Sequence, residues 1–342
     1  MRIAFVGKGG SGKTTLSALF IRHLAQLGRP VLAIDADINQ HLGQALGLGD
    51  ADVAAIPPLG ADLAWIKDHL RGDNTRIAST SAMIKTTPPG RGSRLLRLDP
   101  GDELHRRFAR PAGAAHLMCT GEFESDDIGV SCYHSKTGAV ELYLNHLVDG
   151  PGEYVVVDMT AGADVLASGL FTRFDLVVLV SEPTRRGVGV HRQFREHAEG
   201  HAVRLAVLGN KVAGADDEAW LRAQLGDALL ATVSHSAWVR AAEQGRAPEF
   251  ALVEAGTRAA LETVLAELDG LQRDWDAYHR DTVHFHLRNA AAWANRSVGV
   301  DLAEQVDPEF VPGPAALGPN SPANRGGPDR AGPVPVGAVP AG

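Results

Sequence analysis

The sequence lacks several features that would assign it to particular protein classes. Only two of its 342 residues are cysteines, Cys119 and Cys132, too few for a disulfide framework. No apolar run approaches the roughly 18 to 20 residues that a membrane-spanning helix needs, and the first residues show no apolar core of a signal peptide. Basic residues are not in excess, since the formal net charge is -8, which argues against non-specific binding to nucleic acid. We therefore expect a cytoplasmic protein.

The composition is that of a folded domain followed by a different kind of segment. Hydrophobic residues make up 44% of the chain and charged residues 22%, as in ordinary globular proteins. We predict one domain over residues 1–300. From Asp307 the chain turns to Pro, Gly and Ala, which cannot bury enough apolar surface to fold, so we predict a disordered tail over residues 307–342.

Apolar runs and helical patterns alternate along the domain. Ile3 to Val6 is a short apolar run, Thr14 to Leu27 has apolar residues at helical spacing, and Val31 to Ile34 is a second apolar run. Strand, helix and strand together make one βαβ unit. Further strands are predicted at 155–157, 176–180, 205–208 and 229–233. The pattern predicts an α/β fold with a mostly parallel sheet and helices on both faces.

The stretch from 50 to 115 is harder to interpret. It is rich in Pro, Gly and Arg, and its hydrophobic periodicity is weak. We interpret it as an insertion in the domain, with short helices near Leu63 to Arg71 and Asp102 to Phe108.

A phosphate-binding loop follows the first predicted strand. Residues Gly7 to Thr14 match the pattern G-x-x-x-x-G-K-[ST], in which backbone N–H groups surround a phosphate at the start of a helix. In this P-loop, Lys13 would reach the β- and γ-phosphates of a nucleotide, and the Thr14 hydroxyl would bind Mg²⁺. The residues predicted to contact the nucleotide here are Gly9, Gly10, Ser11, Gly12, Lys13, Thr14 and Thr15.

The segment from Lys8 to Thr15 resembles the deviant Walker A motif of the MinD/ParA/CooC class of ATPases. The resemblance extends from Arg2 to about Val253. It implies a P-loop NTPase fold, ATP as the substrate and a homodimer that closes around ATP. In that class a lysine at the position of Lys8 crosses to the partner subunit's nucleotide, where it neutralises phosphate charge as an arginine finger does.

Two carboxylate segments follow predicted strands, at the edge where ligands of parallel sheets bind. Asp35 and Asp37 follow the second strand, and Asp158 follows the strand at 155–157 and leads to Gly162. The resemblance implies that Asp37 orients the attacking water, that Asp35 lies nearer Mg²⁺, and that Asp158 holds Mg²⁺ through water. One of the first two could instead cap the next helix.

Asn210 follows another strand at the place where the resembling class contacts the base. An amide can donate to and accept from an adenine edge. GTPases place an aspartate three residues after such an Asn, whereas this chain has Ala213, so we predict ATP over GTP. The alternative is that Asn210 only forms a turn.

Within the class, the chain looks most like the CooC branch, accessory ATPases of nickel insertion into carbon monoxide dehydrogenase. The matching segments are 158–164, 180–183 and 233–248. That branch has a Cys-x-Cys metal pair where this chain has Val130 and Cys132. Two subunits would then offer two thiols in place of four, so Cys119 and Cys132 are either buried core thiols or parts of a metal site that needs other ligands.

Three functions remain open. The first is a metallocentre-maturation ATPase with an unknown protein client. The second is a MinD- or ParA-like positioning switch, but the chain does not end in a basic amphipathic helix, so we expect neither membrane nor DNA as a partner. Arg185, Arg186, Arg192 and Arg195 could contact DNA phosphates or form a solvated helix face. The third is a nucleotide sensor with negligible turnover.

Overall fold

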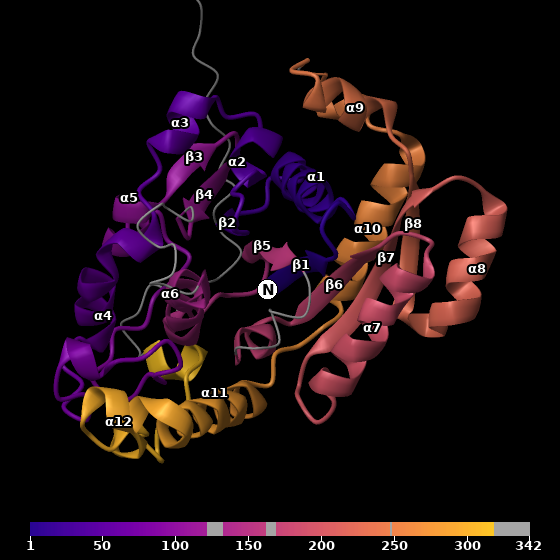
Figure 1. Cartoon of the computed structure of the whole chain (residues 1–342). Coiled ribbons are helices and arrows are strands. Elements are labelled where there is room, and N and C mark those ends of the chain that lie inside the picture. Colours follow the sequence, from indigo (N-terminus) through magenta and orange to yellow (C-terminus); the bar gives the residue numbers. More distant parts are fainter. Residues whose placement is uncertain (122–132, 162–168, 247, 318–342) are drawn as a thin grey trace, which may run out of the picture.

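The computed structural model describes residues 1–121, 133–161, 169–246 and 248–317. A single eight-stranded sheet runs through these residues (Figure 1). Its strands are β1 (Arg2–Gly7), β2 (Val31–Ala36), β3 (Arg110–Ala112), β4 (Ala115–Cys119), β5 (Tyr154–Ala161), β6 (Leu176–Ser181), β7 (Arg204–Val212) and β8 (Leu229–Ser234).

The strand order is β3-β4-β2-β5-β1-β6-β7-β8, and every neighbouring pair is parallel except β3 and β4. The mostly parallel α/β sheet predicted from the sequence is thus confirmed. Strand β1 lies at the centre, where Ile3 is in register with Val156 of β5 and Leu176 of β6. The carboxyl ends of β1, β2 and β5 therefore meet at one edge of the sheet.

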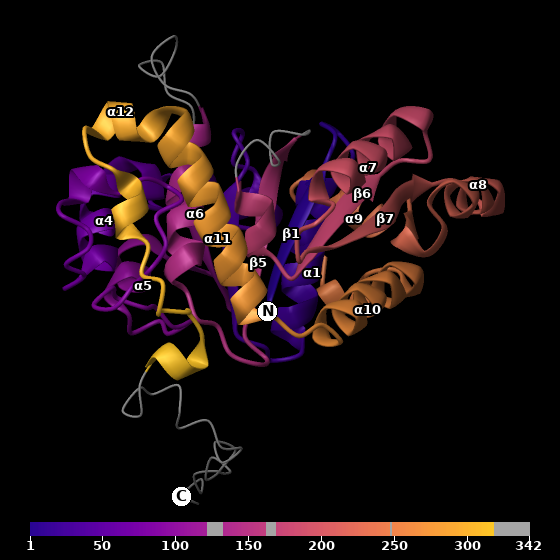
Figure 2. The ribbon, with the colours of Figure 1, turned by 90° about the horizontal axis from the view of Figure 1, so that it is seen from below.

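Helices cover both faces of the sheet (Figures 1 and 2). One face carries α1 (Lys13–Gln26), α2 (Leu42–Ala45), α9 (Ala237–Glu243) and α10 (Ala255–Asp269); the other carries α4 (Leu63–Arg71), α5 (Glu103–Phe108), α6 (Tyr133–His146), α7 (Arg185–Ala198), α8 (Ala215–Leu225) and α11 (Trp275–Asn289). The remaining helical segments are α3 (Asp50–Ala54), α12 (Asn295–Val298), η1 (Leu59–Asp62), η2 (Thr80–Ala82), η5 (Gly169–Arg173), η6 (Gly226–Ala228), η7 (Phe250–Leu252), η8 (Ala290–Ala294), η9 (Leu302–Gln305) and η10 (Pro314–Leu317). Among the helices of the described residues, none combines the length and the hydropathy needed to cross a bilayer.

The alternation of side chains along a strand explains why two separate cores form. In β1, Ile3 and Phe5 pack into the cluster beneath α1 and α10, whereas Ala4 and Val6 pack into the cluster on the other face. All four are fully buried, as a central parallel strand requires. On α1, the apolar residues that recur at helical spacing face the sheet and are buried: Leu16, Leu19, Phe20 and Leu24.

The stretch from 50 to 115 belongs to the core. Its two predicted helices are present as α4 and α5. Ile66, Leu70 and Phe108 are buried in the same cluster as Val155 and Val157 of β5. The sequence did not indicate the antiparallel pair of β3 and β4, because each strand is short and Pro111 interrupts the first.

The first residues of the predicted tail include Asp307, which makes specific contacts with the rest of the domain. The Asp307 side chain is buried and accepts hydrogen bonds from the backbone N–H of Arg91 at 3.2 Å and from Arg91 Nε at 2.9 Å. Asp307 is therefore held by polar contacts, which a prediction based on apolar content does not detect. Residues 318–342 of the predicted tail lie outside the described residues.

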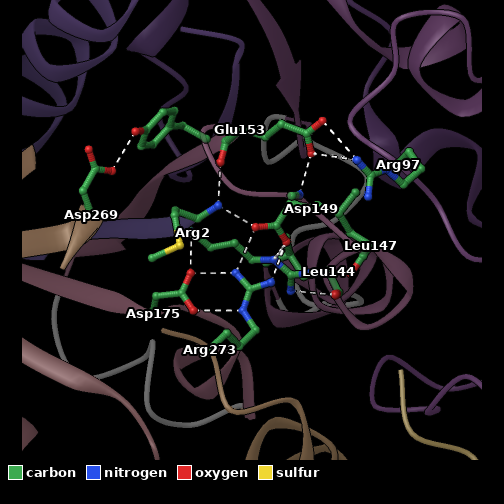
Figure 3. Close-up of polar contacts among 12 residues, drawn as sticks. Arg2, Arg97, Leu144, Leu147, Asp149, Glu153, Asp175, Asp269 and Arg273 are labelled. Carbon is green, nitrogen blue, oxygen red and sulfur yellow. Dashed lines mark hydrogen bonds and ion pairs between the residues drawn. The ribbon is translucent and has the colours of Figure 1, made fainter. Parts of the chain in front are cut away.

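A buried ion network closes the sheet at the amino-terminal ends of its central strands (Figure 3). Arg2 Nε donates to Asp149 Oδ1 at 2.8 Å, and Arg273 donates to both Asp149 and Asp175 at 2.6 to 3.0 Å. Burial alone would raise the pKa of Asp149, but the charges of Arg273 and Arg2 outweigh it and hold that pKa well below its ordinary value. Every charge in this network faces an opposite one.

Candidate nucleotide-binding site

A cavity of about 860 Å³ opens at the carboxyl ends of the strands. Its walls come from the P-loop and the first turn of α1, from Asp37 after β2, from Asn210 on β7, and from the segment that joins β8 to α9. A volume of this size accommodates a nucleotide. The cavity therefore lies where ligands of open α/β sheets bind.

The P-loop backbone has the form of an anion site. Gly10 and Gly12 have φ angles of 81° and 92°, which only glycine adopts without strain. A Cβ at Gly12 would overlap the amide nitrogen of Asn210, so close packing requires glycine there as well. Helix α1 begins after Gly12 with no side-chain cap. Its first N–H groups and the positive end of its dipole are thus available to a phosphate.

Lys13 and Asp37 form an ion pair inside the cavity. Both side chains are largely buried, and both line the cavity wall. Asp37 Oδ1 also accepts a hydrogen bond from the backbone N–H of Asn39 at 2.9 Å. The predicted phosphate-binding lysine and the predicted catalytic carboxylate therefore lie in direct contact.

Asp35 performs the capping role that the sequence left open for one of the two aspartates. Its Oδ2 accepts a hydrogen bond at 2.8 Å from the N–H of Leu42, the first residue of α2, and its Oδ1 accepts one at 3.2 Å from the N–H of Asp37. Burial raises the pKa of the Asp35 carboxyl to about 7, and the charge of Asp37 acts in the same direction. Asp35 thus shapes the loop that presents Asp37.

Asp158 is a buried carboxylate without compensation. It lies beside Asp35 in the register of β5 and β2, and its exposed fraction is 0%. Neither of its oxygens has a hydrogen-bond partner among the described residues. Burial, followed by the charge of Asp35, raises its pKa well above the ordinary value, although Lys13 and the nearby Thr14 hydroxyl oppose that shift. A cation at this point would relieve the repulsion.

Oxygen ligands of this kind suit Mg²⁺. The predicted set, Thr14, Asp35 and Asp158, lies close together: Asp35 and Asp158 are in register on β2 and β5, and Asp158 is near Thr14, which lines the cavity. It is not a closed cage, because within the described ranges no three His, Cys, Asp or Glu residues are placed to hold a metal by themselves. Mg²⁺ is usually held by one or two carboxylates together with substrate phosphates and water, which agrees with an incomplete protein set.

Lys8 does not line this cavity. Its side chain is exposed and borders a separate hollow, of about 390 Å³, together with Ser11, Arg185 and Arg186. The hollow lies between the P-loop and the start of α7. The sequence-predicted lysine is therefore available at the surface rather than committed to its own subunit's cavity.

Asn210 and Lys211 support the P-loop from β7. Asn210 Nδ2 donates to the Ser11 carbonyl at 2.7 Å. Lys211 Nζ donates to the Gly10 carbonyl at 2.6 Å and to Glu182 Oε1 at 2.7 Å. The sequence did not indicate the contacts of Lys211 and Glu182, although an Asn-Lys pair directly after a strand was the available signal.

The two cysteines differ in what can be said of them. Cys119 is buried at the end of β4, in register with Asp35, which agrees with the interpretation of Cys119 as a buried core thiol. Cys132 and Val130, where the resemblance places the metal pair, lie outside the described residues, as does Gly162.

Known proteins share this sequence and fold. Residues 3–248 match the family model described as the CobQ/CobB/MinD/ParA nucleotide binding domain. The chain is 26% identical to the carbon monoxide dehydrogenase accessory protein CooC of Rhodospirillum rubrum over 71% of this chain and 87% of that protein. It is 27% identical to an uncharacterized ATP-binding protein of Methanocaldococcus jannaschii over 64% of this chain and 77% of that protein.

The fold is also found in a putative plasmid partition protein of Borrelia burgdorferi, solved with bound AMPPNP. The TM-score is 0.52 at 14% identity, over 78% of this chain and 98% of that one. The family model spans more than half of the chain and includes the P-loop, Asp37, Asp158 and Asn210. The chain therefore belongs to the CobQ/CobB/MinD/ParA family of nucleotide-binding P-loop proteins.

Proposed function

We propose that this protein is a Mg²⁺-dependent ATPase that converts ATP and water to ADP and phosphate. The observation that carries the proposal is the buried Asp158 carboxylate, whose oxygens have no hydrogen-bond partner among the described residues and which lies near Thr14, a residue that lines the cavity together with the P-loop. Such a group is costly unless a cation neutralises it. When bound, Mg²⁺ would neutralise phosphate charge at this point.

The residues of the cavity then have separate roles in phosphate binding and in hydrolysis. The amides of the P-loop and Lys13 bind the β- and γ-phosphates. When phosphate oxygens pair with Lys13, Asp37 is released from its ion pair, and its carboxylate becomes free to orient the attacking water. Phosphate binding and the readiness of the general base are linked in this way.

The base preference follows from Asn210. Its Nδ2 donates to the Ser11 carbonyl, which leaves Oδ1 as an acceptor for the exocyclic amine of adenine. Guanine presents a carbonyl oxygen at the equivalent place, which an acceptor would repel. We therefore propose ATP over GTP.

Hydrolysis is tested with purified full-length protein, MgATP and a phosphate-release assay. Asp37→Asn should bind ATP at least as tightly as the wild type, because Lys13 loses its internal partner, but should turn over about 100-fold more slowly. The matched control is Asp52→Asn, a substitution on α3, which does not line the cavity. Wild-type protein that binds MgATP but releases no phosphate would leave a nucleotide sensor in place of an ATPase.

We further propose that ATP drives formation of a homodimer through Lys8. The exposure of Lys8 outside its own cavity supports this, since a lysine that serves the partner's nucleotide has to project from the surface. With a non-hydrolysable ATP analogue, light scattering should show a doubled mass for the wild type and a much weaker change for Lys8→Ala. A mass that stays monomeric in every nucleotide state would refute the dimer.

The similarity to CooC supports assistance in the maturation of a client enzyme's metal centre as the cellular role. The test is co-purification with an Asp37→Ala variant held in the ATP state. A metalloenzyme precursor among the bound proteins would support the role, whereas plasmid or chromosomal DNA in the bound fraction would favour the partitioning alternative.

A further inference from the structure

One wall of the cavity is built from a segment with little support from the sheet. Ser234, His235 and Ser236 line the cavity after β8, and Val239 and Arg240 of α9 continue the same wall. Figure 1 shows α9 at the upper edge of the molecule, and its contacts with the core beneath α1 and α10 come from Trp238, Val239 and Ala242. The position of this wall therefore depends on a small number of contacts.

Glu254 supplies the contacts at the first turn of α9. Its Oε1 accepts hydrogen bonds from the backbone N–H groups of Ala237 at 2.8 Å and Trp238 at 3.2 Å. Its Oε2 accepts one from the Ser236 hydroxyl at 2.7 Å. Ser236 Oγ in turn accepts from the N–H of Val239 at 2.9 Å. A carboxylate that precedes α10 thus completes the cap of α9, where N–H groups otherwise lack partners.

The second anchor of α9 points the other way. Trp238 is buried in the core beneath α1 and α10, its indole nitrogen donates to the Glu249 carbonyl at 2.9 Å, and its ring meets Phe250 edge to face. This anchor fixes the helix to the body but does not reach the cavity-lining turn.

Glu254 is ionised at neutral pH. Although burial acts to raise it, the pKa of Glu254 is lowered by its hydrogen bonds from Ser236 and from backbone amides.

We propose that Glu254 is a positioning residue for base selection: it holds Ser236 to Trp238 in place, and through them the wall against which the base of the nucleotide packs. The proposal rests on the proposed function, because the phosphates must lie at the P-loop for the base to reach this wall. Glu254 itself does not line the cavity. It acts through the segment that it holds.

Binding measurements with three ligands separate this role from general stability. ATP, GTP and inorganic tripolyphosphate are titrated, with Mg²⁺, into the full chain by calorimetry. Tripolyphosphate needs only the P-loop, so it reports on the phosphate site alone. The variants are Glu254→Ala and Glu254→Gln, with Glu267→Gln as control, since Glu267 lies on α10, the helix that Glu254 precedes, and pairs with Arg204 away from the cavity.

We expect Glu254→Ala to weaken ATP binding by about tenfold, bring the affinities of ATP and GTP closer together, and leave tripolyphosphate within about twofold of the wild type. Glu254→Gln should recover most of the loss. Its amide oxygen can still accept from Ala237, and its amide group can donate to the Ser236 hydroxyl. The control should match the wild type for all three ligands.

Three outcomes would overturn the inference. Glu254→Ala with unchanged ATP affinity would show that the wall needs no such support. Equal weakening of ATP and tripolyphosphate would show a general structural role. If Glu254→Ala does not fold, Ser236→Ala removes the same contact from the other side, and an unchanged ratio of ATP to GTP affinity in that variant would refute the proposal. Failure of the wild type to bind any nucleotide would instead refute the proposed function.

Discussion

The two ends of β1 contain buried charges under opposite conditions. At its first residue, Arg2 lies in a network in which Asp149 and Asp175 face two guanidinium groups (Figure 3). About 17 Å further along the strand, beyond Gly7, Asp35, Asp37 and Asp158 share a single lysine. The pKa of Asp149 is lowered, whereas the pKa values of Asp35 and Asp158 are raised.

This difference indicates that the charges at one end of β1 stabilise the fold, whereas those at the other end form a site for a ligand. A network with matched charges is complete in the chain itself, and breaking it leaves an unpaired charge in the interior. A cluster with excess negative charge is incomplete, and only a cation from outside completes it. The following predictions test that contrast, beginning with the largest expected effect.

Removal of the single lysine should have the largest effect. Lys13→Ala leaves the three carboxylates without a cation and deprives the phosphates of their nearest one, so ATP affinity should fall by a factor of about 1,000 or more. Calorimetric titration with MgATP measures it. The matched control is Lys67→Ala on α4, which does not line the cavity. An affinity for Lys13→Ala equal to that of the wild type would contradict the P-loop assignment.

Breaking the matched network should cost stability instead. Asp149→Asn leaves Arg2 and Arg273 short of a partner in the interior, and we expect the free energy of unfolding to fall by about 3–5 kcal/mol. Urea denaturation measures this, and ATP affinity measured under native conditions should stay within about twofold. If the variant does not fold, Arg273→Lys tests the same network more mildly. A loss below about 1 kcal/mol would show that the network is not a stabilising centre.

Removal of a carboxylate from the cluster of Asp35, Asp37 and Asp158 should raise the free energy of unfolding, whereas removal of Asp149 lowers it. Asp158→Asn removes an uncompensated charge, so at pH 8 and without nucleotide the variant should be more stable than the wild type by about 1 kcal/mol, while MgATP turnover is lost. A carboxyl whose pKa is raised in the folded protein binds more protons there than in the unfolded chain, so its contribution to stability falls as the pH rises from about 4 towards its folded pKa. That folded pKa is about 7 for Asp35 and well above the ordinary value for Asp158.

The advantage of Asp158→Asn should therefore be larger at pH 8 than at pH 5 in thermal denaturation. Asp149 has the opposite pH dependence because its pKa is lowered in the folded protein. The stability that it contributes is present above about pH 4 and is lost only as the pH falls further. The contribution of Asp149 to stability should therefore be constant between pH 5 and 8. If the wild type is more stable than Asp158→Asn at pH 8 without nucleotide or metal, the carboxylate cluster does not lower the stability of the protein.

The smallest effect concerns the end of the chain. A protein ending at Leu317 should keep its ATP turnover and its melting temperature, because the contacts of Asp307 with Arg91 remain. A protein ending at Val306 loses them and should melt at a lower temperature than the protein ending at Leu317. If the two truncated proteins melt at the same temperature, the polar anchor at Asp307 contributes nothing measurable.

The comparison also shows what a sequence can reveal. The P-loop and the carboxylates at the carboxyl ends of β2 and β5 could be predicted because each depends on residues a few positions apart, within or next to an apolar run. The network at Arg2 could not, since Asp149 lies 147 residues away from it and only the fold brings them together. Glu254 was missed for the same reason, because no local pattern links it to Ala237.

The choice between Asp35 and Asp37 shows an intermediate case. The spacing of the two aspartates allowed either to cap the next helix, and only the backbone of the loop decides that Asp35 reaches Leu42 while Asp37 reaches Lys13. The ion pair of Asp307 with Arg91 is another contact that composition could not indicate, because the two residues lie far apart in the sequence.

The central place of β1 has a consequence for the synthesis of the chain. Its neighbours in the sheet are β5 and β6, so Arg2 finds its register partner at Val155 and Ile3 finds one at Leu176. At a ribosomal rate of about 5–20 residues per second, the first strand waits on the order of 10 to 30 seconds before either neighbour emerges. During that time four consecutive apolar residues, Ile3 to Val6, have no strand to pair with. The pairing of β1 is therefore a long-range event that has to follow the synthesis of β5 or β6.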